Sequence, residues 1–221
     1  MNIISVASVQ TLYDYEETYW MIDGKPIVQY IDEYRKQGKC EQLNKFGSML
    51  GLLPAWTGML EWRADNSFIW EMIYANESLN VPILVCEDDC DLSCIVIIAK
   101  IRKTNDRVYW DKIGLLNHEN ENIYDEIHSG ILCLESYTQE DWEKYGDNVA
   151  LETSCSEIFK SWVSENWDEE LIRRRRNYTK PYMQKDENIY WIEDTNWEFD
   201  CKEYQKVISV YRNIYIANMG D

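Results

Sequence analysis

The chain has 221 residues, of which 40 are acidic and 22 basic, so its formal net charge is −18. It also contains 10 Trp and 16 Tyr, and 45% of its residues are hydrophobic, which suits a folded core and not a disordered acidic tail. So negative a charge disfavours nucleic acid and anionic membranes as partners, and it favours either a basic partner or solubility alone.

Nothing in the sequence predicts export or a membrane span. Residues 1–6 lack the basic and apolar regions of a signal peptide, and no apolar run approaches about 18 residues. The seven cysteines are an odd set without the disulfide pattern of a small secreted domain. We therefore expect a cytoplasmic protein with reduced thiols, several of them buried.

The first third of the chain predicts a strand, a helix and short helical turns. Residues 19–22 predict a strand that ends in an Asp-Gly turn. An amphipathic helix is then predicted from Pro26 to Gly38, because proline is tolerated in the first helical turn and glycine ends helices. Residues 43–62, interrupted by glycines and a proline, predict short helical turns.

The middle of the chain predicts a hairpin. Residues 82–86 and 92–101 are apolar on both faces, as strands covered on both sides are. A turn at 104–106 joins the second run to an alternating strand at 108–113. Residues 131–134 predict a further strand.

The last third predicts two amphipathic helices. Ser154 has the capping-box spacing to a glutamate three residues later, and an apolar stripe at 159–171 follows. Asp200 is a weaker start signal for a second helix, whose stripe covers 204–215. Without a repeat or a linker, we expect a single α+β domain over residues 1–221. Its mixed or antiparallel sheet would have a central hairpin and flanking amphipathic helices.

Asp89 and Asp91, just after an apolar run, are the candidate metal ligands. Hard oxygen ligands suit a divalent cation, and these few residues resemble the Asp-x-Asp motif of haloacid-dehalogenase phosphatases and metal-dependent glycosyltransferases. The alternative is that residues 87–91 form the solvated turn of a hairpin. We adopt this alternative, and therefore expect no metal and no cofactor.

Three cysteines, Cys86, Cys90 and Cys94, recur every four residues around these acids. On an extended chain that spacing separates them by about 13 Å, which is too far for one ion. They could share an ion only if the chain turned sharply at Asp88 and Asp89. The sequence therefore predicts buried structural thiols.

Four consecutive arginines, Arg173 to Arg176, indicate either a phosphate-binding patch or the end of a helix. Positive charge is favourable at a helix C-terminus. Glu169 and Glu170 precede Arg173 and Arg174 by four residues, the favourable orientation for helical ion pairs. We therefore expect a structural role for the arginines.

Common enzyme motifs are absent from the sequence. It has no Gly-x-x-x-x-Gly-Lys phosphate loop, no Gly-x-Gly-x-x-Gly, no Gly-x-Ser-x-Gly and no His-Glu-x-x-His. His118 and His128 lie in a polar stretch with no Ser or Cys partner that the sequence can assign. We expect the chain not to be an enzyme.

Two acidic stretches are interleaved with aromatic residues. Residues 117–147 contain nine acids against one base, and residues 186–203 contain seven against one. Carboxylates that attract a partner, beside Trp and Tyr that anchor it, are typical of tight protein interfaces. The predicted partner-binding residues are Glu119, Glu121, Asp125, Glu126, Glu140, Asp141, Trp142, Glu143, Glu193 and Asp194. The alternative is a solvated face whose aromatic side chains point inward.

In style the chain resembles the immunity proteins of bacterial polymorphic toxin systems. The resemblance rests on its acidic, Trp- and Tyr-rich α+β character and on segments 19–26 (YWMIDGKP), 53–56 (LPAW) and 81–86 (VPILVC). It implies a non-enzymatic cytoplasmic protein that neutralises a cognate basic toxin domain, often a nuclease, by covering its active site or substrate groove. The alternatives are a scaffold protein, or a divalent-metal-dependent enzyme that acts on phosphate or sugar-phosphate through Asp89 and Asp91.

Overall fold

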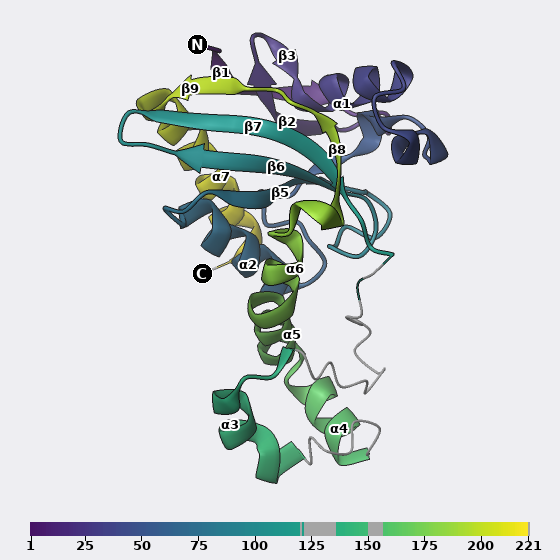
Figure 1. Cartoon of the computed structure of the whole chain (residues 1–221), viewed down its shortest axis with the longest axis vertical. Helices are drawn as coiled ribbons and strands as arrows, with labels where there is room; N and C mark the ends of the chain where they lie inside the picture. Colours follow the sequence, from purple (N-terminus) through teal and green to yellow (C-terminus); the bar gives the residue numbers. More distant parts are fainter. Residues whose placement is uncertain (120, 122–135, 150–156, 221) are drawn as a thin grey trace.

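The computed structural model describes residues 1–119, 121, 136–149 and 157–220. The chain forms a body of antiparallel sheets with helices packed on them, and a helical lobe that extends from one end of the body (Figure 1). The predicted α+β class is therefore confirmed.

The N-terminal sheet has three antiparallel strands in the order β1 (Ile4–Gln10), β2 (Glu16–Ile22) and β3 (Lys25–Pro26). Asp23 and Gly24, with φ values of 51° and 81°, form the tight turn between β2 and β3. Helix α1 (Ile27–Lys36) follows at once, with Pro26 as its N-cap residue. The predicted strand, turn and helix are confirmed, whereas β1 was not predicted.

The larger sheet is antiparallel throughout its described pairs. Its strands follow the order β4 (Leu53–Pro54), β5 (Leu79–Val85), β6 (Val96–Lys103), β7 (Arg107–Leu116) and β8 (Ile189–Glu193), and β9 (Trp197–Asp200) pairs with β7 alongside β8. Every residue of β5 is buried, and β6 and β7 form the predicted hairpin. Strands β8 and β9 were not predicted.

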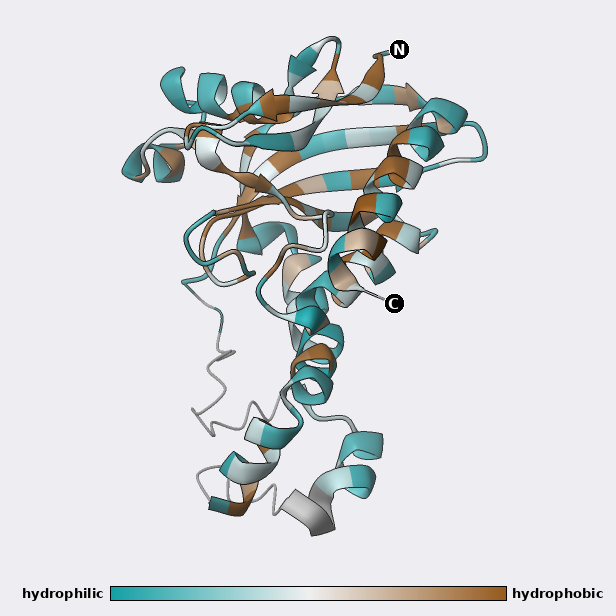
Figure 2. Ribbon diagram, turned by 180° about the vertical axis from the view of Figure 1, so that it is seen from behind, coloured by the Kyte–Doolittle hydropathy of each residue, from teal (hydrophilic) through white to brown (hydrophobic). Residues whose placement is uncertain are grey.

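Two helices, α2 (Arg63–Tyr74) and α7 (Cys201–Met219), pack against one face of this sheet (Figure 1). At the centre of the body, Trp20, Trp56, Trp110 and Tyr211 meet, so that β2, β7 and α7 share one core. The ring centroids of Trp20 lie 4.7 Å from Trp56 and 4.5 Å from Tyr211. Hydrophobic residues gather in the strands and in α7, whereas the lobe helices are mostly hydrophilic (Figure 2).

The lobe consists of α3 (Gln139–Val149), α4 (Glu157–Glu165) and α5 (Trp167–Arg174). A π-helical turn (Arg175–Thr179) and α6 (Lys180–Met183) continue α5 toward the body (Figure 1). The predicted stripe at 159–171 is buried in a second, smaller core. It is divided between two helices, because Asn166 has a non-helical φ of −129° and separates α4 from α5.

The remaining elements are short. Two 3₁₀ turns (Glu41–Lys45 and Met49–Gly51) confirm the first half of the helical turns predicted at residues 43–62, and a third (Asp186–Asn188) precedes β8. The second half of that prediction is wrong, because residues 53–54 form β4 and residues 55–62 contain no helix. Asp200 caps α7 as predicted, because its carboxylate accepts hydrogen bonds from the next helical N–H groups. Helix α2 was not predicted. The strand predicted at 131–134 and the capping residue Ser154 lie outside the described residues.

A helix that crosses a membrane must be long and almost entirely apolar. Within the described ranges, none is both long and apolar enough to cross a bilayer.

Candidate functional site

The consecutive arginines bind acids of the same chain. Arg173, Arg174 and Arg175 are buried, and Arg176 is exposed. Glu170, itself fully buried, accepts hydrogen bonds of 2.6 Å from Nη2 of Arg173 and from Nε of Arg174. The predicted structural role and the predicted Glu170–Arg174 pair are confirmed. The predicted Glu169–Arg173 pair is wrong, because Arg173 pairs with Glu170 and Glu169 pairs with Lys144. The predicted helix end is also wrong, because the segment continues as a π-helical turn (Arg175–Thr179).

Arg175 and Arg176 connect the segment after α5 to helix α2. Nε of Arg175 donates to Oδ1 of Asp65 over 2.7 Å, and both side chains are buried. At the surface, Nε of Arg176 donates to Oε2 of Glu71 over 2.9 Å. The two pairs hold the base of the lobe against the body.

The surface of the lobe is acidic. Residues 139–174 contain ten acids and four bases, and two of those bases, Arg173 and Arg174, are buried. The other two, Lys144 and Lys160, each pair with a glutamate of the lobe. Exposed carboxylates with no basic partner in the described part of the chain are those of Glu140, Glu143, Glu165 and Asp168.

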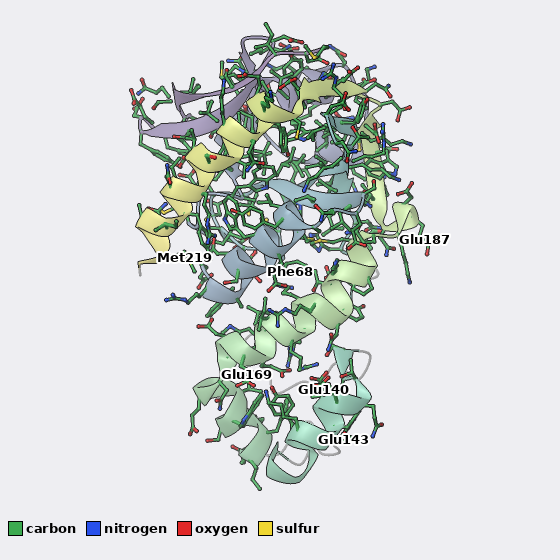
Figure 3. The ribbon with its side chains drawn as sticks, turned by 90° about the vertical axis from the view of Figure 1, so that its left-hand side faces the viewer. Phe68, Glu140, Glu143, Glu169, Glu187 and Met219 are labelled. Atoms are coloured by element: carbon green, nitrogen blue, oxygen red, sulfur yellow. The ribbon has the colours of Figure 1, made fainter. Side chains whose placement is uncertain are left out.

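The pair between Lys144 and Glu169 keeps a carboxylate of the lobe ionised. Lys144 and the hydroxyl of Tyr145 both donate to Glu169 on α5, which joins α3 to α5. The hydrogen bond from Lys144, followed by that from Tyr145, lowers the pKa of Glu169. Glu169 therefore stays ionised at neutral pH. Glu140, Glu143 and Glu169 lie together at the lobe end of the molecule (Figure 3).

A groove of about 460 Å³ lies between the start of α2 and the turn between α4 and α5. We call it the acidic groove, and it is lined by Glu61, Trp62, Arg63, Ser164, Glu165, Asn166, Trp167, Asp168 and Glu169. Trp62 and Trp167 meet edge to face with their centroids 5.6 Å apart. The indole N–H of Trp167 is buried and has no acceptor among the described residues. The groove therefore combines four carboxylates with an aromatic wall.

The predicted acidic residues do not form one surface. Glu140 and Glu143 are exposed on α3 in the lobe, whereas Glu193 ends β8 and Asp194 follows it, and β8 belongs to the body (Figure 1). Glu193 pairs with Lys39 at 2.7 Å, and Asp194 pairs with Lys112 at 3.4 Å. Asp125 and Glu126 lie outside the described residues.

The other predicted acids serve local structure. Glu121 is nearly buried, and its carboxylate accepts a hydrogen bond of 2.7 Å from Nδ1 of His118, while Glu119 accepts a hydrogen bond from the hydroxyl of Tyr190. Asp141 accepts hydrogen bonds from the backbone and hydroxyl of Thr138 at the start of α3. These carboxylates are therefore already engaged within the chain.

Trp142, the predicted aromatic anchor, is half-buried and packs against the small core of the lobe. Its ring centroid lies 5.7 Å from that of Tyr137. The hydroxyl of Tyr137 in turn donates to both oxygens of buried Glu170. Trp142 thus matches the alternative, in which aromatic side chains of the acidic stretch point inward.

Asp89 and Asp91 have different partners. The carboxylate of Asp91 is mostly buried and accepts hydrogen bonds of 2.8 Å from the backbone and hydroxyl of Ser93. Asp89 is exposed and accepts from the thiol of Cys86 at 3.6 Å. Residues 87–89 form a turn, so the solvated-turn interpretation holds for the backbone.

The acidic groove was not predicted as a site. Trp167 lies in the predicted apolar stripe, Glu169 and Glu170 in predicted helical ion pairs, and Trp62 in the predicted helical turns of residues 43–62, whereas Asp168 had no predicted role. The available signal was the Trp-Asp-Glu-Glu sequence at 167–170, in which an aromatic residue directly precedes three acids. Only the fold places Glu61 and Trp62 opposite this segment.

We compared the chain with protein-family models, with curated proteins and with solved structures. None of the three comparisons finds a match. We therefore infer function from the side chains of the acidic lobe and of its groove.

Proposed function

We propose that this chain is an immunity protein: a cytoplasmic, non-enzymatic inhibitor that binds a cognate basic toxin domain, such as a nuclease. The acidic groove is the observation that carries the proposal. It has four carboxylates and two tryptophans in its lining, on a lobe whose surface lysines already have acid partners. A basic partner is the chemistry that such a surface fits.

The carboxylates and the tryptophans would contribute differently to binding. Exposed carboxylates on the lobe raise the rate of encounter with a basic protein, and salt screens this attraction. Trp62 is half-buried and is held edge to face by the buried Trp167, so its ring offers a rigid apolar surface on which an arginine or an aromatic side chain can pack.

The first test is co-expression with the product of the gene immediately upstream, followed by co-purification at low and high salt. We expect a one-to-one complex with a basic protein that is toxic when expressed alone. Affinity should fall as the ionic strength rises. An affinity that does not change between low and physiological salt would contradict the electrostatic mechanism.

The second test locates the interface with matched charge reversals. Asp168→Lys changes the acidic groove, whereas Glu187→Lys makes the same charge change at an exposed site on the body (Figure 3). We expect Asp168→Lys to weaken binding by about tenfold or more and Glu187→Lys to change it by less than about threefold. If the two substitutions changed the affinity equally, the toxin would not bind at the acidic groove.

A further inference from the structure

The loop between β5 and β6 brings two thiols and a carboxylate together. Cys86 directly follows β5, and Cys94 lies two residues before the start of β6. The backbone N–H of Cys86 donates to the carbonyl of Ile95 over 3.0 Å, so the two ends of the loop are held side by side. The turn at residues 87–89 then directs Asp89 back toward Cys86.

The three donor atoms have the separations that one metal ion needs. The sulfur atoms of Cys86 and Cys94 and a carboxylate oxygen of Asp89 all lie within 4.8 Å of one another. Sulfur and oxygen of Cys86 and Asp89 are 3.6 Å apart. In a tetrahedral zinc site with Zn–S bonds of about 2.3 Å, neighbouring ligand atoms are about 3.8 Å apart. Side-chain rotations that move the ligand atoms by about 1 Å would therefore bring all three within bonding distance of one ion.

The neighbouring cysteine and aspartate are occupied by other contacts. The thiol of Cys90 donates to the carbonyl of Met59 over 3.2 Å, and the carboxylate of Asp91 is held by Ser93. The spacing that excluded a shared ion on an extended chain therefore does not exclude Cys86 and Cys94, because the loop turns between them. The pair that converges is eight residues apart.

We propose that Cys86, Asp89 and Cys94 form a binding site for one zinc ion. Two thiolates select a borderline-soft metal such as Zn²⁺ over Mg²⁺ or Ca²⁺, and the carboxylate is a third accepted zinc ligand. On binding, the two thiols each release a proton to solvent, and two Zn–S bonds and one Zn–O bond form. The fourth position is left to water. Cys86 also lines a cavity of about 280 Å³, together with Glu87 and Asp88 of the same loop.

Cobalt(II) is the probe that tests the site directly. The reduced, metal-free full chain is titrated with Co²⁺, and thiolate-to-cobalt charge-transfer absorption is followed before Zn²⁺ is added. We expect one equivalent of Co²⁺ to produce the band and Zn²⁺ to remove it. The band should be lost in the Cys86→Ser/Cys94→Ser double variant, and Asp89→Asn should weaken Zn²⁺ binding by about tenfold or more.

Two matched controls come from the same loop. Cys90→Ser retains a donor for the carbonyl of Met59, and Asp91→Asn changes the aspartate two residues from Asp89. Both should bind Co²⁺ as the unmodified chain does. A band that persists in the double variant, or no band in the unmodified chain, overturns the proposal.

A measurement on the unmodified chain makes the test independent of whether the variants fold. The rate of thiol alkylation is mapped by mass spectrometry with and without Zn²⁺. We expect Zn²⁺ to protect Cys86 and Cys94 and to leave Cys90 unchanged. Equal rates at all three thiols, or a Cys86–Cys94 disulfide whose reduced form takes up no zinc, would show that the pair is not a metal site.

Discussion

At the scale of single residues, buried charge is concentrated where the lobe joins the body. Arg174 and Arg175 are among the largest fully buried side chains, and their charges are compatible with burial because acids lie beside them. Removing ions from water costs several kcal/mol each, and a partner at hydrogen-bond distance offsets that cost. Such buried pairs fix the position of the lobe on the body more than they add to the net stability of the fold.

Arg175→Met tests the buried pair with Asp65. The substitution leaves the carboxylate of Asp65 buried without this arginine, so we expect the free energy of unfolding to fall by about 3–5 kcal/mol. Arg176→Met, at the next residue, removes only an exposed pair with Glu71 and should cost at most about 1 kcal/mol. Urea denaturation measures both. Equal losses would mean that burial of Arg175 has no energetic consequence.

Buried tyrosines predict a loss of stability at alkaline pH. Desolvation raises the pKa of Tyr19, Tyr204 and Tyr211 above the value near 10 of the unfolded chain, and that of Tyr34 to about 12. Above pH 10 the unfolded chain loses protons that the folded chain keeps. Stability should therefore fall by about 1.4 kcal/mol per pH unit for each fully buried tyrosine.

Lys103 has the opposite effect on stability at alkaline pH, but it is one group against several tyrosines. Burial lowers its pKa, so stability gains from Lys103 as the pH rises toward the pKa of the unfolded lysine. The tyrosines outnumber it, and urea denaturation at pH 8 and above pH 10 should show a net loss. Tyr34→Phe is the control, because the hydroxyl of Tyr34 has no hydrogen bond in the described part of the chain. It should leave stability at pH 7 unchanged and release about one proton fewer on alkaline unfolding.

At the scale of elements, the pairing of β7 with β8 depends on the absence of a side chain at Gly114. A Cβ atom there would lie 2.3 Å from Cγ2 of Ile189 and 2.9 Å from the ring of Trp191. Both are β8 residues, and their neighbour Tyr190 presents its backbone oxygen at 3.1 Å. Strand β8 therefore lies closer to β7 than an alanine at position 114 would permit.

Gly114→Ala should destabilise the protein by at least about 2 kcal/mol, because the close approach of β8 must be given up. Chemical denaturation measures the loss, and hydrogen exchange of the β8 amides should accelerate. Gly47→Ala is the matched control, since a Cβ atom there meets nothing within 4 Å. A Gly114→Ala protein as stable as the Gly47→Ala protein would show that β8 shifts without cost.

Elements were predictable where one local pattern decided them. The α1 helix, the β6–β7 hairpin and the N-cap of α7 follow from turn residues, apolar periodicity and a capping aspartate. Helix α2 was missed although eight of its residues are buried, because it buries polar residues such as Asp65 and Asn66 and so lacks a clean apolar stripe. Strand β8 has β-branched and aromatic residues that favour a strand, but it lies within the acidic stretch 186–203, which was interpreted as a partner surface, and its pairing partner β7 lies far away in sequence.

At the scale of the whole molecule, the net charge of −18 opposes compactness through self-repulsion. Salt shortens the range of this repulsion, from about 30 Å at 0.01 M to about 10 Å at 0.1 M. The melting temperature should therefore rise over that range of NaCl concentration. Differential scanning calorimetry checks this, and a melting temperature that falls with salt would mean that surface ion pairs outweigh the repulsion.

The sequence by itself determined the α+β class, the absence of familiar enzyme motifs, the acidic character and the local pairing of Glu170 with Arg174, because each depends on composition or on residues close in the chain. Tertiary structure decided which charges are exposed and which residues meet. In the folded chain, Glu121, Asp141 and Glu193 form hydrogen bonds or ion pairs with other residues of the protein. The fold also packs Trp62 against Trp167 and brings the thiols of Cys86 and Cys94 together. Those outcomes depend on contacts between segments that chain turns bring together, and local periodicity carries no information about them.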